Sequence, residues 1–209
     1  LYNESCLDAQ MRRQIYGDIY DDSMWLIDLV ENLLSVTRIE EGRMQIRQSA
    51  ELVDEVIKEA LKHTGQSRTG RTIKVEEEDE LILAKMDARL IVQVLINLIG
   101  NAVKYTPQGT DITVRVKKEK AENAERSQVI ISVCDLGNGI PDDRKERVFD
   151  MFYTGSDQVA DSRRSLGLGL GLCRSIINAH GGKIWISDNI PHGAVVTFTL
   201  PAEEVALNE

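Results

Sequence analysis

Residues 97–106 read NLIGNAVKYT and close a helix that the sequence predicts to begin after Asp87. Apolar residues form one stripe of this helix, at Ile91, Val94, Leu95, Leu98 and Ala102, and polar residues form another, at Gln93, Asn97, Asn101 and Lys104. Asparagine is a mediocre helix former, so two of them one turn apart in a helix interior indicate a function. An amide oxygen suits Mg²⁺, and an ammonium one turn further on could meet a phosphate. The alternative at this point is a polar face that only meets water.

Two glycine-containing stretches follow this helix. Residues 135–141, DLGNGIP, come directly after an apolar strand predicted at Val129–Val133. An aspartate followed by two glycines lets the backbone turn tightly and approach a flat ligand, while the carboxylate accepts from an exocyclic amine. By itself this stretch indicates only a turn. Residues 167–172, GLGLGL, run into a helix predicted to end near His180, so their amide N–H groups and the helix dipole favour a bound anion.

These glycines do not match the common nucleotide-binding motifs. The spacing is G-x-G-x-G, not the dinucleotide-binding G-x-G-x-x-G, and no acidic residue follows at the distance that a ribose contact needs. The P-loop signature is absent, since Ile184 follows Gly182 and Lys183, and neither HRD nor DFG occurs. The sequence therefore excludes P-loop NTPases and eukaryotic-type protein kinases.

The 209 residues include 25 Lys and Arg against 34 Asp and Glu, which gives a net charge of −9. Such a chain repels nucleic acid and anionic membranes overall, so we expect it to contact neither. Its 3 cysteines lie far apart, which favours a reducing compartment, and no apolar run approaches the ~18 residues of a membrane span. We expect a cytoplasmic domain. Because the chain begins at Leu1 without a Met, we also expect a piece of a longer protein.

A helical pattern extends over Gln10–Glu40, with Gly17 as its only glycine or proline. Its apolar residues step by threes and fours and form a seam at Ile15, Ile19, Leu26, Leu29, Leu33 and Val36. Further apolar residues widen that face, which favours a helix packed in a bundle; a core helix of a single domain is the alternative. Gly42 ends the helix, so we predict a bundle segment at residues 1–42 and a second domain at 43–209.

The second domain is predicted to be α+β. Met44 and Ile46 alternate with polar residues and predict a short strand, and a helix is expected to follow Ser49. The acidic run Glu76–Glu80 is interpreted as a solvated turn between two short strands. Strand pairs are predicted at residues 111–118 with 128–135 and at 183–187 with 194–200. Helices on one face of a mixed, largely antiparallel sheet make a two-layer sandwich, here preceded by a long bundle helix.

Four motifs stand in order along this domain. They are residues 97–106, the turn Asp135-x-Gly137-x-Gly139, the VFDMF run at 148–152 and the GLGLGL run at 167–172. In this order and spacing they resemble the N, G1, F and G2 boxes of the ATP-binding domain of bacterial sensor histidine kinases. The resemblance implies the Bergerat ATP-binding fold for residues 43–209 and the end of a dimerisation and phosphotransfer hairpin for residues 1–42. Details near residues 172–174 and 179–182 are most similar to the potassium-responsive sensor kinases.

The resemblance implies a Mg²⁺·ATP site. Asn101 would ligate Mg²⁺ with Asn97 beside it, Lys104 would reach a phosphate, Tyr105 would stack on adenine, and Asp135 would receive the adenine amino group. The other residues implied to line the ATP site are Gly137, Gly139, Ile140, Phe152, Gly167, Leu168, Gly169, Leu170, Gly171 and Thr197. Residues 153–166 would form a lid over the triphosphate, with Phe149 and Phe152 at its base.

None of the three histidines has the surroundings of the family's phosphoacceptor. That histidine is followed by an acid and soon by Thr/Ser-Pro, whereas Thr-Gly follows His63, Gly-Gly follows His180 and Gly-Ala follows His192. His63 and His180 are interpreted as helix-end residues and His192 as part of a turn. We therefore expect the acceptor helix to precede Leu1, so that this chain binds Mg²⁺·ATP without labelling itself.

For the intact protein the resemblance implies transfer of the γ-phosphoryl group to a histidine and then to an aspartate of a response regulator receiver domain. It also implies a homodimer anchored in the bacterial inner membrane, with potassium or osmotic signalling as the context. Two other functions stay open: an ATPase clamp of the gyrase, Hsp90 and MutL group, and a dimerisation module that has lost nucleotide binding. The clamp enzymes carry a glutamate base where this chain has Asn97, and an amide cannot take a proton from water.

Overall fold

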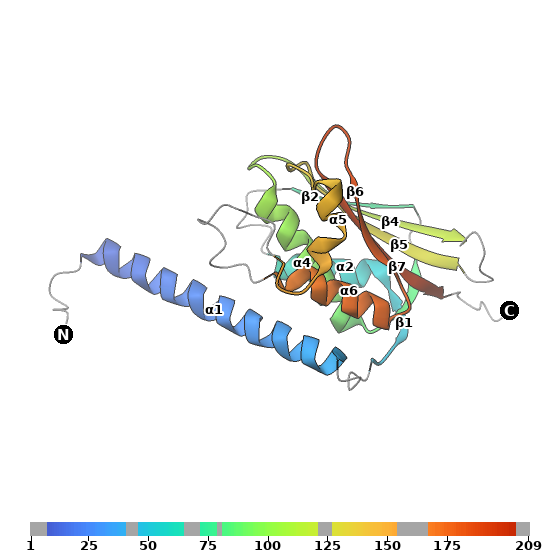
Figure 1. Cartoon of the computed structure of the whole chain (residues 1–209), viewed down its shortest axis with the longest axis horizontal. Helices are drawn as coiled ribbons and strands as arrows, with labels where there is room; N and C mark the ends of the chain where they lie inside the picture. The colour runs from blue at the N-terminus through green and yellow to red at the C-terminus, as the bar shows by residue number, and fades with distance from the viewer. Residues whose placement is uncertain are drawn as a thin grey trace.

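The computed structural model describes residues 8–40, 46–64, 72–78, 81–120, 127–153 and 167–203 (Figure 1). Its helices are α1 (Ala9–Glu40), α2 (Val53–His63), α4 (Ala88–Tyr105), α5 (Asp142–Lys145) and α6 (Gly169–Ala179), with a 3₁₀ turn η2 (Arg147–Phe149). Its strands are β1 (Ser49–Leu52), β2 (Ile73–Glu77), β3 (Leu83–Met86), β4 (Ile112–Lys120), β5 (Ser127–Cys134), β6 (Ile184–Asp188) and β7 (Ala194–Glu203). The long helix expected at residues 10–40 is confirmed as α1.

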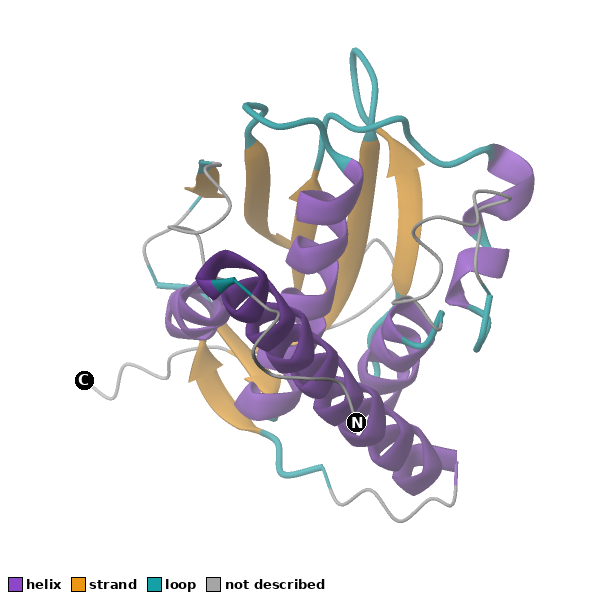
Figure 2. Ribbon diagram, turned by 90° about the vertical axis from the view of Figure 1, so that its left-hand side faces the viewer, coloured by secondary structure: helices purple, strands orange, loops and turns teal. Residues whose placement is uncertain are grey.

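The described strands form one mixed sheet. Its order is β1-β3-β7-β5-β4-β2, and β6 also pairs with β7. Only β2 and β4 run parallel; the other described pairs are antiparallel. Strand β7 pairs with β5 along one edge and shares its other edge between β6 and β3. Figure 2 shows the helices on one face of this sheet, so the predicted two-layer α+β fold is confirmed.

Alternation along the central strands builds one side of the core. The buried residues of β4 and β5 include Ile112, Val114, Val116, Val129, Ile131 and Val133. All five apolar residues predicted to form the stripe of α4 are buried against this layer. Because α4 contacts both α2 and α6, the three helices and the sheet share one core. The polar face of α4 is left at the edge of that core, where Asn97 and Asn101 are half-buried.

The prediction for residues 44–52 is wrong in detail. The helix expected after Ser49 begins at Val53, because Ser49–Leu52 form strand β1. This strand pairs with β3 from Ser49 opposite Met86 onward, a partner too distant in sequence for local periodicity to reveal. Ile46 lies outside a strand, and Met44 lies outside the described residues.

The prediction of a turn at Glu76–Glu80 is wrong at its first two residues, and Glu78 forms an exposed bend. Glu76 and Glu77 belong to β2, which runs parallel to β4. Ion pairs join the two strands and their ends: Lys74 Nζ to Asp111 Oδ2 at 2.5 Å, Arg115 Nε to Glu76 Oε2 at 2.9 Å, and Lys117 Nζ to Glu78 Oε1 at 3.5 Å. Asp79 and Glu80 lie outside the described residues. Cations on β4 therefore offset acids that the sequence places in a continuous run.

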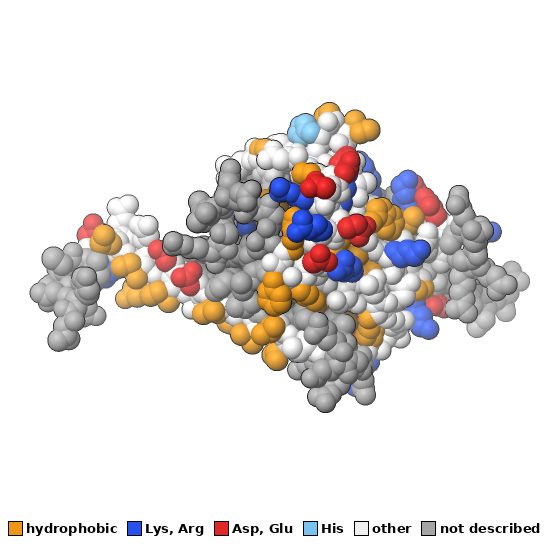
Figure 3. Space-filling model, viewed as in Figure 1, with side chains coloured by type: hydrophobic (Ala, Val, Ile, Leu, Met, Phe, Trp, Pro, Cys, Tyr) orange, Lys and Arg blue, Asp and Glu red, His pale blue; other side chains and the backbone are white. Residues whose placement is uncertain are grey.

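Helix α1 extends beyond the α+β body and contacts it at α6. The seam residues Ile15, Ile19, Leu26 and Leu33 are exposed, and Figure 3 shows apolar side chains along one edge of the helix. Within the described ranges, no helix combines the length and apolar character needed to cross a membrane.

Candidate nucleotide-binding site

The Asp135–Pro141 turn leaves the end of β5 with its first carboxylate already oriented. Asp135 is 9% exposed, and its Oδ1 accepts hydrogen bonds from the backbone N–H groups of Gly137 at 2.8 Å and Ala194 at 3.2 Å. Neither bond uses Oδ2, so these described contacts leave that oxygen to accept from a donor on a ligand. Backbone donors that hold one oxygen in place make the carboxylate a fixed acceptor.

Glycines allow the turn to be held between two other elements. A Cβ on Gly137 would lie 2.6 Å from the carbonyl oxygen of Tyr105, at the end of α4. A Cβ on Gly193, in the β6–β7 hairpin, would lie 2.0 Å from the carbonyl oxygen of Asp135, and its φ of 115° also favours glycine. The same carbonyl accepts a hydrogen bond from Asn189 Nδ2 at 2.7 Å. The structure therefore brings Asp135, Gly137 and Tyr105 together.

The amide face of α4 meets the start of α6. A Cβ on Gly169, the first residue of α6, would lie 3.7 Å from Asn97 Oδ1. The Nδ2 atom of Asn97 is buried and forms no hydrogen bond of good geometry in the described part of the chain, although the Asn97 side chain lies close enough to the Cys173 sulfur to lower the pKa of that thiol. Helix α6 has no side-chain cap and no acidic residue in its first turn. An amide side chain beside uncapped helix N–H groups fits an anion such as a phosphate.

The last turn of α4 presents a cation and an aromatic ring. Tyr105 is 58% exposed, and Lys104 Nζ lies 5.2 Å from the centre of its ring. Asn101, one turn earlier, is half-buried. Within the described ranges, no group of three or more His, Cys, Asp or Glu side chains could hold a metal ion. The amide oxygens of Asn97 and Asn101 are hard neutral ligands of the kind that suits Mg²⁺ shared with phosphates and water.

The two ends of the predicted lid meet at its base. The N–H of Phe152 donates to the carbonyl oxygen of Gly167 at 3.1 Å, and a Cβ on Gly167 would lie 2.3 Å from the carbonyl oxygen of Tyr153. Phe149 is buried, whereas Phe152 is 65% exposed with a φ of 65°, so only Phe149 belongs to the core. Residues 154–166, which carry the predicted lid, lie outside the described residues.

The remaining residues of the two glycine-containing motifs contribute to packing in this structure. A Cβ on Gly171 would lie 2.9 Å from Met151 Sδ, so this glycine permits close contact between α6 and the VFDMF run. Leu168 is buried at the start of α6, and Leu170 and Ile140 pack partly against the core. Gly139, with a φ of 71°, lies against the carbonyl of Gly193. These positions shape the site through the backbone.

Thr197 is not brought together with Asp135. Its hydroxyl lies 2.9 Å from that of Ser132, its partner across the two strands. This pair lies three residues before Asp135 in the sequence of β5 and three residues after Ala194 in β7. Ala194 is the residue of β7 that contacts Asp135, through its backbone N–H. The sequence reasoning missed Ala194, Gly193 and Asn189. The signal that could have found them is the glycine at the start of the last predicted strand.

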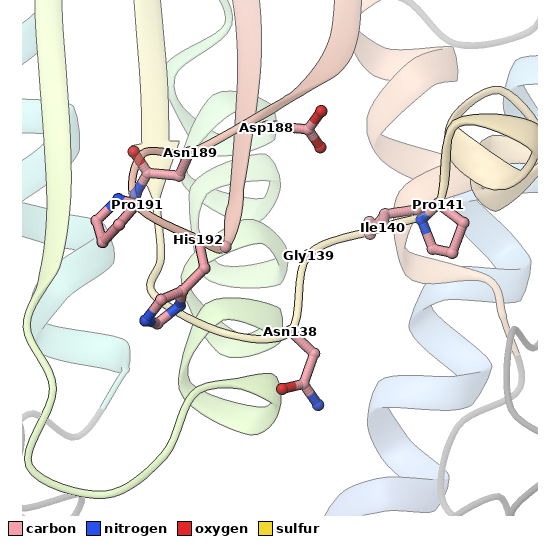
Figure 4. Close-up of a pocket in the computed structure, with 9 residues that line it drawn as sticks. Asn138, Gly139, Ile140, Pro141, Asp188, Asn189, Pro191 and His192 are labelled. Carbon is pink, nitrogen blue, oxygen red and sulfur yellow. The ribbon is translucent and has the colours of Figure 1, made fainter.

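An open cavity of about 380 Å³ adjoins the turn (Figure 4). Residues 138–141 form one wall and residues 188, 189 and 191–193 the other. The His192 Nδ1 atom lies 3.2 Å from the carbonyl oxygen of Gly137, so the cavity shares backbone with the Asp135 turn. Gly139 and Ile140 line this cavity, whereas Asn97 and Gly169 do not.

The two described cysteines near the site, Cys134 and Cys173, are unsuited to nucleophilic chemistry. Burial raises the pKa of the Cys173 thiol to about 12, against a smaller opposing effect of the Asn97 side chain. Burial also raises the pKa of Cys134, an effect that the Arg115 charge partly offsets. The three histidines lie as the sequence predicts: His63 exposed at the end of α2, His192 in the β6–β7 turn, and His180 buried at the end of α6. The site thus contains binding groups and fixed donors but no activated nucleophile among the described residues.

Comparison with known proteins identifies the family. Residues 86–204 match the family described as histidine kinase-, DNA gyrase B-, and HSP90-like ATPases. The chain belongs to this ATPase family. The matched residues of this ATPase domain contain all four motifs, and members of the family bind ATP. Its predicted kinship with sensor histidine kinases is confirmed by the individual relatives.

The chain is similar to the sensor protein KdpD of Clostridium acetobutylicum, with 39% identity over 203 residues, 97% of this chain and 22% of that protein. It is 30% identical over 195 residues to the adaptive-response sensory kinase SasA of Gloeothece citriformis, covering 92% of this chain and 48% of that kinase. The chain therefore spans less than half the length of these relatives. It is an ATPase domain of the sensor histidine kinase type.

Solved structures show the same architecture. Histidine kinase ThkA in complex with response regulator protein TrrA matches with a TM-score of 0.68 and 26% identity, over 96% of this chain and 54% of that one. Full-length ShkA in complex with AMPPNP matches with a TM-score of 0.70 over 94% of this chain and 40% of that one, and its 23% identity supports the fold alone.

Proposed function

We propose that the chain binds Mg²⁺·ATP where α4, the Asp135–Pro141 turn and the start of α6 meet. The observation that carries this proposal is the Asn97 amide: its Nδ2 is buried without a hydrogen bond of good geometry in the described ranges, and its Oδ1 lies beside Gly169 at the start of α6. An unpaired buried donor costs free energy unless a ligand accepts its hydrogen bond. A phosphate oxygen is the acceptor that the neighbouring uncapped helix terminus also favours.

Each side chain has a distinct role in this proposal. Asn97 and Asn101 hold the ion through amide oxygens, Lys104 pairs with a phosphate oxygen, Tyr105 stacks on the base, and Asp135 Oδ2 accepts from its amino group. When bound there, Mg²⁺ would neutralise phosphate charge, and the two asparagines and Lys104 would orient the γ-phosphoryl group. Residues 167–170 are proposed to surround the triphosphate through their backbone. A contact of Thr197 with the base stays a prediction that its pairing with Ser132 does not support.

We propose further that the intact protein transfers the γ-phosphoryl group to a histidine of a dimerisation domain and then to an aspartate of a response regulator. The similarity to KdpD and the complex of ThkA with TrrA support this relay. A homodimeric, membrane-anchored parent with this domain in the cytoplasm, acting in potassium or osmotic signalling, belongs to the same proposal. Positioning and charge neutralisation supply the catalysis, because the described site offers fixed donors and no nucleophile.

Calorimetric titration with Mg²⁺·ATP tests the binding site. The wild-type chain is expected to bind, and Asn101→Ala is expected to lose at least about tenfold in affinity, since an ion-binding oxygen is removed. Asn178→Ala, an exposed asparagine at the end of α6, is the matched control and should bind as the wild type does. Equal binding by Asn101→Ala, or no heat with the wild type, would reject the assignment.

Incubation with γ-labelled ATP tests the position of the phosphoacceptor. We propose that residues 1–209 contain no acceptor, so the chain should stay unlabelled. Acid-labile, base-stable label on the chain would place the acceptor among His63, His180 and His192 and reject this proposal. A steady-state ATPase assay addresses the clamp alternative, because turnover is expected to be slow with Asn97 in place of a glutamate base.

A further inference from the structure

Helices α4 and α6 run antiparallel, and two contacts mark the half of their seam nearest the candidate site. At the site itself Gly169 lies beside Asn97, with 3.7 Å between an added Cβ and Asn97 Oδ1. One turn further from the site, the Cys173 thiol lies 3.9 Å from the carbonyl oxygen of Val94. A thiol donor at this distance is weak. The Asn97 side chain also interacts with the Cys173 sulfur, so this half of the seam has weak polar contacts through sulfur.

His180 closes the far end of the seam with two directional hydrogen bonds. The residue is 2% exposed, and its Nε2 accepts from the backbone N–H of Asp87 at 3.0 Å. Its Nδ1 lies 2.8 Å from the carbonyl oxygen of Ile176, one turn earlier in α6. These partners assign a neutral ring with its proton on Nδ1. Asp87 is the residue before α4, and its Oδ2 accepts from the N–H of Arg47 at 3.2 Å.

The three contacts fall on one stripe of each helix. Positions 87, 94 and 97 oppose positions 180, 173 and 169, with steps of seven and then three or four residues. The rest of the helix pair packs through buried apolar side chains, which tolerate small displacements because burial is not directional. A shift of α6 by one residue would move it ~1.5 Å along its axis and change the distance between Gly169 and Asn97.

We propose that His180 is a positioning residue for the nucleotide: its bond to Asp87 fixes the register of α6 against α4 and so holds the glycine-rich start of α6 beside Asn97. This inference rests on the proposed function of that site. His180 touches no ligand in this arrangement. It acts through α6, because its ring joins the end of α6 to the backbone N–H of the residue before α4 by a directional bond.

Two amide substitutions separate the two hydrogen bonds of the ring. In His180→Gln the Oε1 atom can reach the position of Nε2 and accept from the N–H of Asp87. In His180→Asn the shorter side chain can reproduce only the donor to the carbonyl oxygen of Ile176. If His180 only ends α6, glutamine and asparagine should preserve nucleotide binding equally well. If His180 positions α6, only glutamine should preserve it.

Titration of the full chain with Mg²⁺·ATP, at a temperature where each variant is folded, distinguishes these roles. His180→Gln should bind within about twofold of the wild type, and His180→Asn should bind about 2- to 30-fold more weakly, the range of coupling found for contacts remote from a ligand. Ile176→Val is the control, because it loosens the same helix without removing a directional bond. Wild-type affinity in His180→Asn, or equal losses in both amide variants, would overturn the inference.

A wild-type chain that does not bind Mg²⁺·ATP would reject the proposed function itself, and the inference with it. If His180→Asn does not fold, hydrogen exchange of the wild-type chain decides the question. Because coupling is reciprocal, Mg²⁺·ATP should slow exchange of the Asp87 amide more than exchange of the Val53 amide, which bonds to Ile82. Unchanged protection of Asp87 would overturn the inference.

Discussion

Individual positions in this domain require glycine for different physical reasons. Gly137 has no Cβ because the end of α4 occupies that space, and Gly193 combines a similar restriction with a positive φ. Gly171 lies inside α6 and admits the Met151 side chain instead. The sequence shows only that glycines recur near the two turns. Which of them approaches a ligand and which a neighbouring element depends on contacts distant in the chain.

Gly137→Ala should weaken Mg²⁺·ATP binding at least about tenfold and lower the free energy of unfolding by about 1–3 kcal/mol, because its Cβ would meet the carbonyl oxygen of Tyr105 at 2.6 Å. Gly100→Ala is the control on α4. A Cβ at position 100 would have no atom within 4 Å. Alanine at this position should therefore stabilise the helix by up to about 1 kcal/mol. Calorimetric titration and chemical denaturation of both variants measure the difference; similar behaviour of the two would contradict it.

Glu77 is a side chain whose ionisation opposes folding. Its Oε1 is buried without a partner in the described part of the chain, and burial raises its pKa, with the Asp54 charge adding to the rise and Lys58 opposing it. A carboxyl group whose pKa is higher in the folded state contributes stability below its unfolded pKa, and loses it as pH rises through the folded pKa. Near neutral pH the charged group therefore destabilises the fold.

Glu77→Gln should raise the Tm at pH 7 by roughly 1–3 °C, and this gain should disappear below about pH 4, where the glutamate is protonated. Thermal unfolding followed across that pH range measures the effect. Glu78→Gln is the control, since Glu78 is exposed and paired with Lys117, and it should give no such gain. A pH-independent difference for Glu77→Gln would show that its charge is not the cause.

Among whole elements, helix α1 differs most from its neighbours, because its seam residues Leu26 and Leu33 remain exposed. Apolar side chains at heptad spacing on an exposed helix favour pairing with another helix. The edge strand β2, by contrast, exposes charged side chains. Among the described strands it pairs only with β4, and ion pairs with β4 and the residue before it offset its charges. One element thus leaves an apolar face open and the other presents charge.

Replacing Leu26 and Leu33 together by Glu should reduce self-association of the chain while leaving its affinity for Mg²⁺·ATP unchanged. The reason is that two charges per helix at seam positions cannot be buried without partners. Sedimentation equilibrium over a range of protein concentrations measures the change. Thr37→Glu, an exposed polar position of the same helix, serves as the control. A wild-type chain that is monomeric at all concentrations would remove the proposed role of the seam.

For the molecule as a whole, a net charge of −9 has to be reconciled with a polyanionic ligand. The candidate site does so locally: Lys104, the Asn97 amide and the start of α6 supply the donors. The surface charge therefore excludes nonspecific binding of anions without excluding one specific site.

Saturation with Mg²⁺·ATP should stabilise the folded chain by about 2.7 kcal/mol at a concentration 100 times the Kd. Thermal unfolding at increasing ligand concentrations measures this rise. ATP in the presence of EDTA should give a smaller rise, because the phosphates then face the Asn97 and Asn101 amides without an ion. An equal rise with and without Mg²⁺ would contradict the role of the ion.

Local periodicity and motif spacing were sufficient to predict α1, the two faces of α4, the β4–β5 and β6–β7 pairs and the family of the domain, because each depends on residues close together in the chain or on a fixed order of motifs. Strand β1, the parallel β2–β4 pair and the bond between Asp87 and His180 could not be predicted in this way. The two partners in each contact are tens of residues apart in the sequence, so these contacts form and stabilise the structure only once the chain has folded. The same reason separates Thr197 from Asp135, since β5 and β7 pair in a register that places Ala194 there instead.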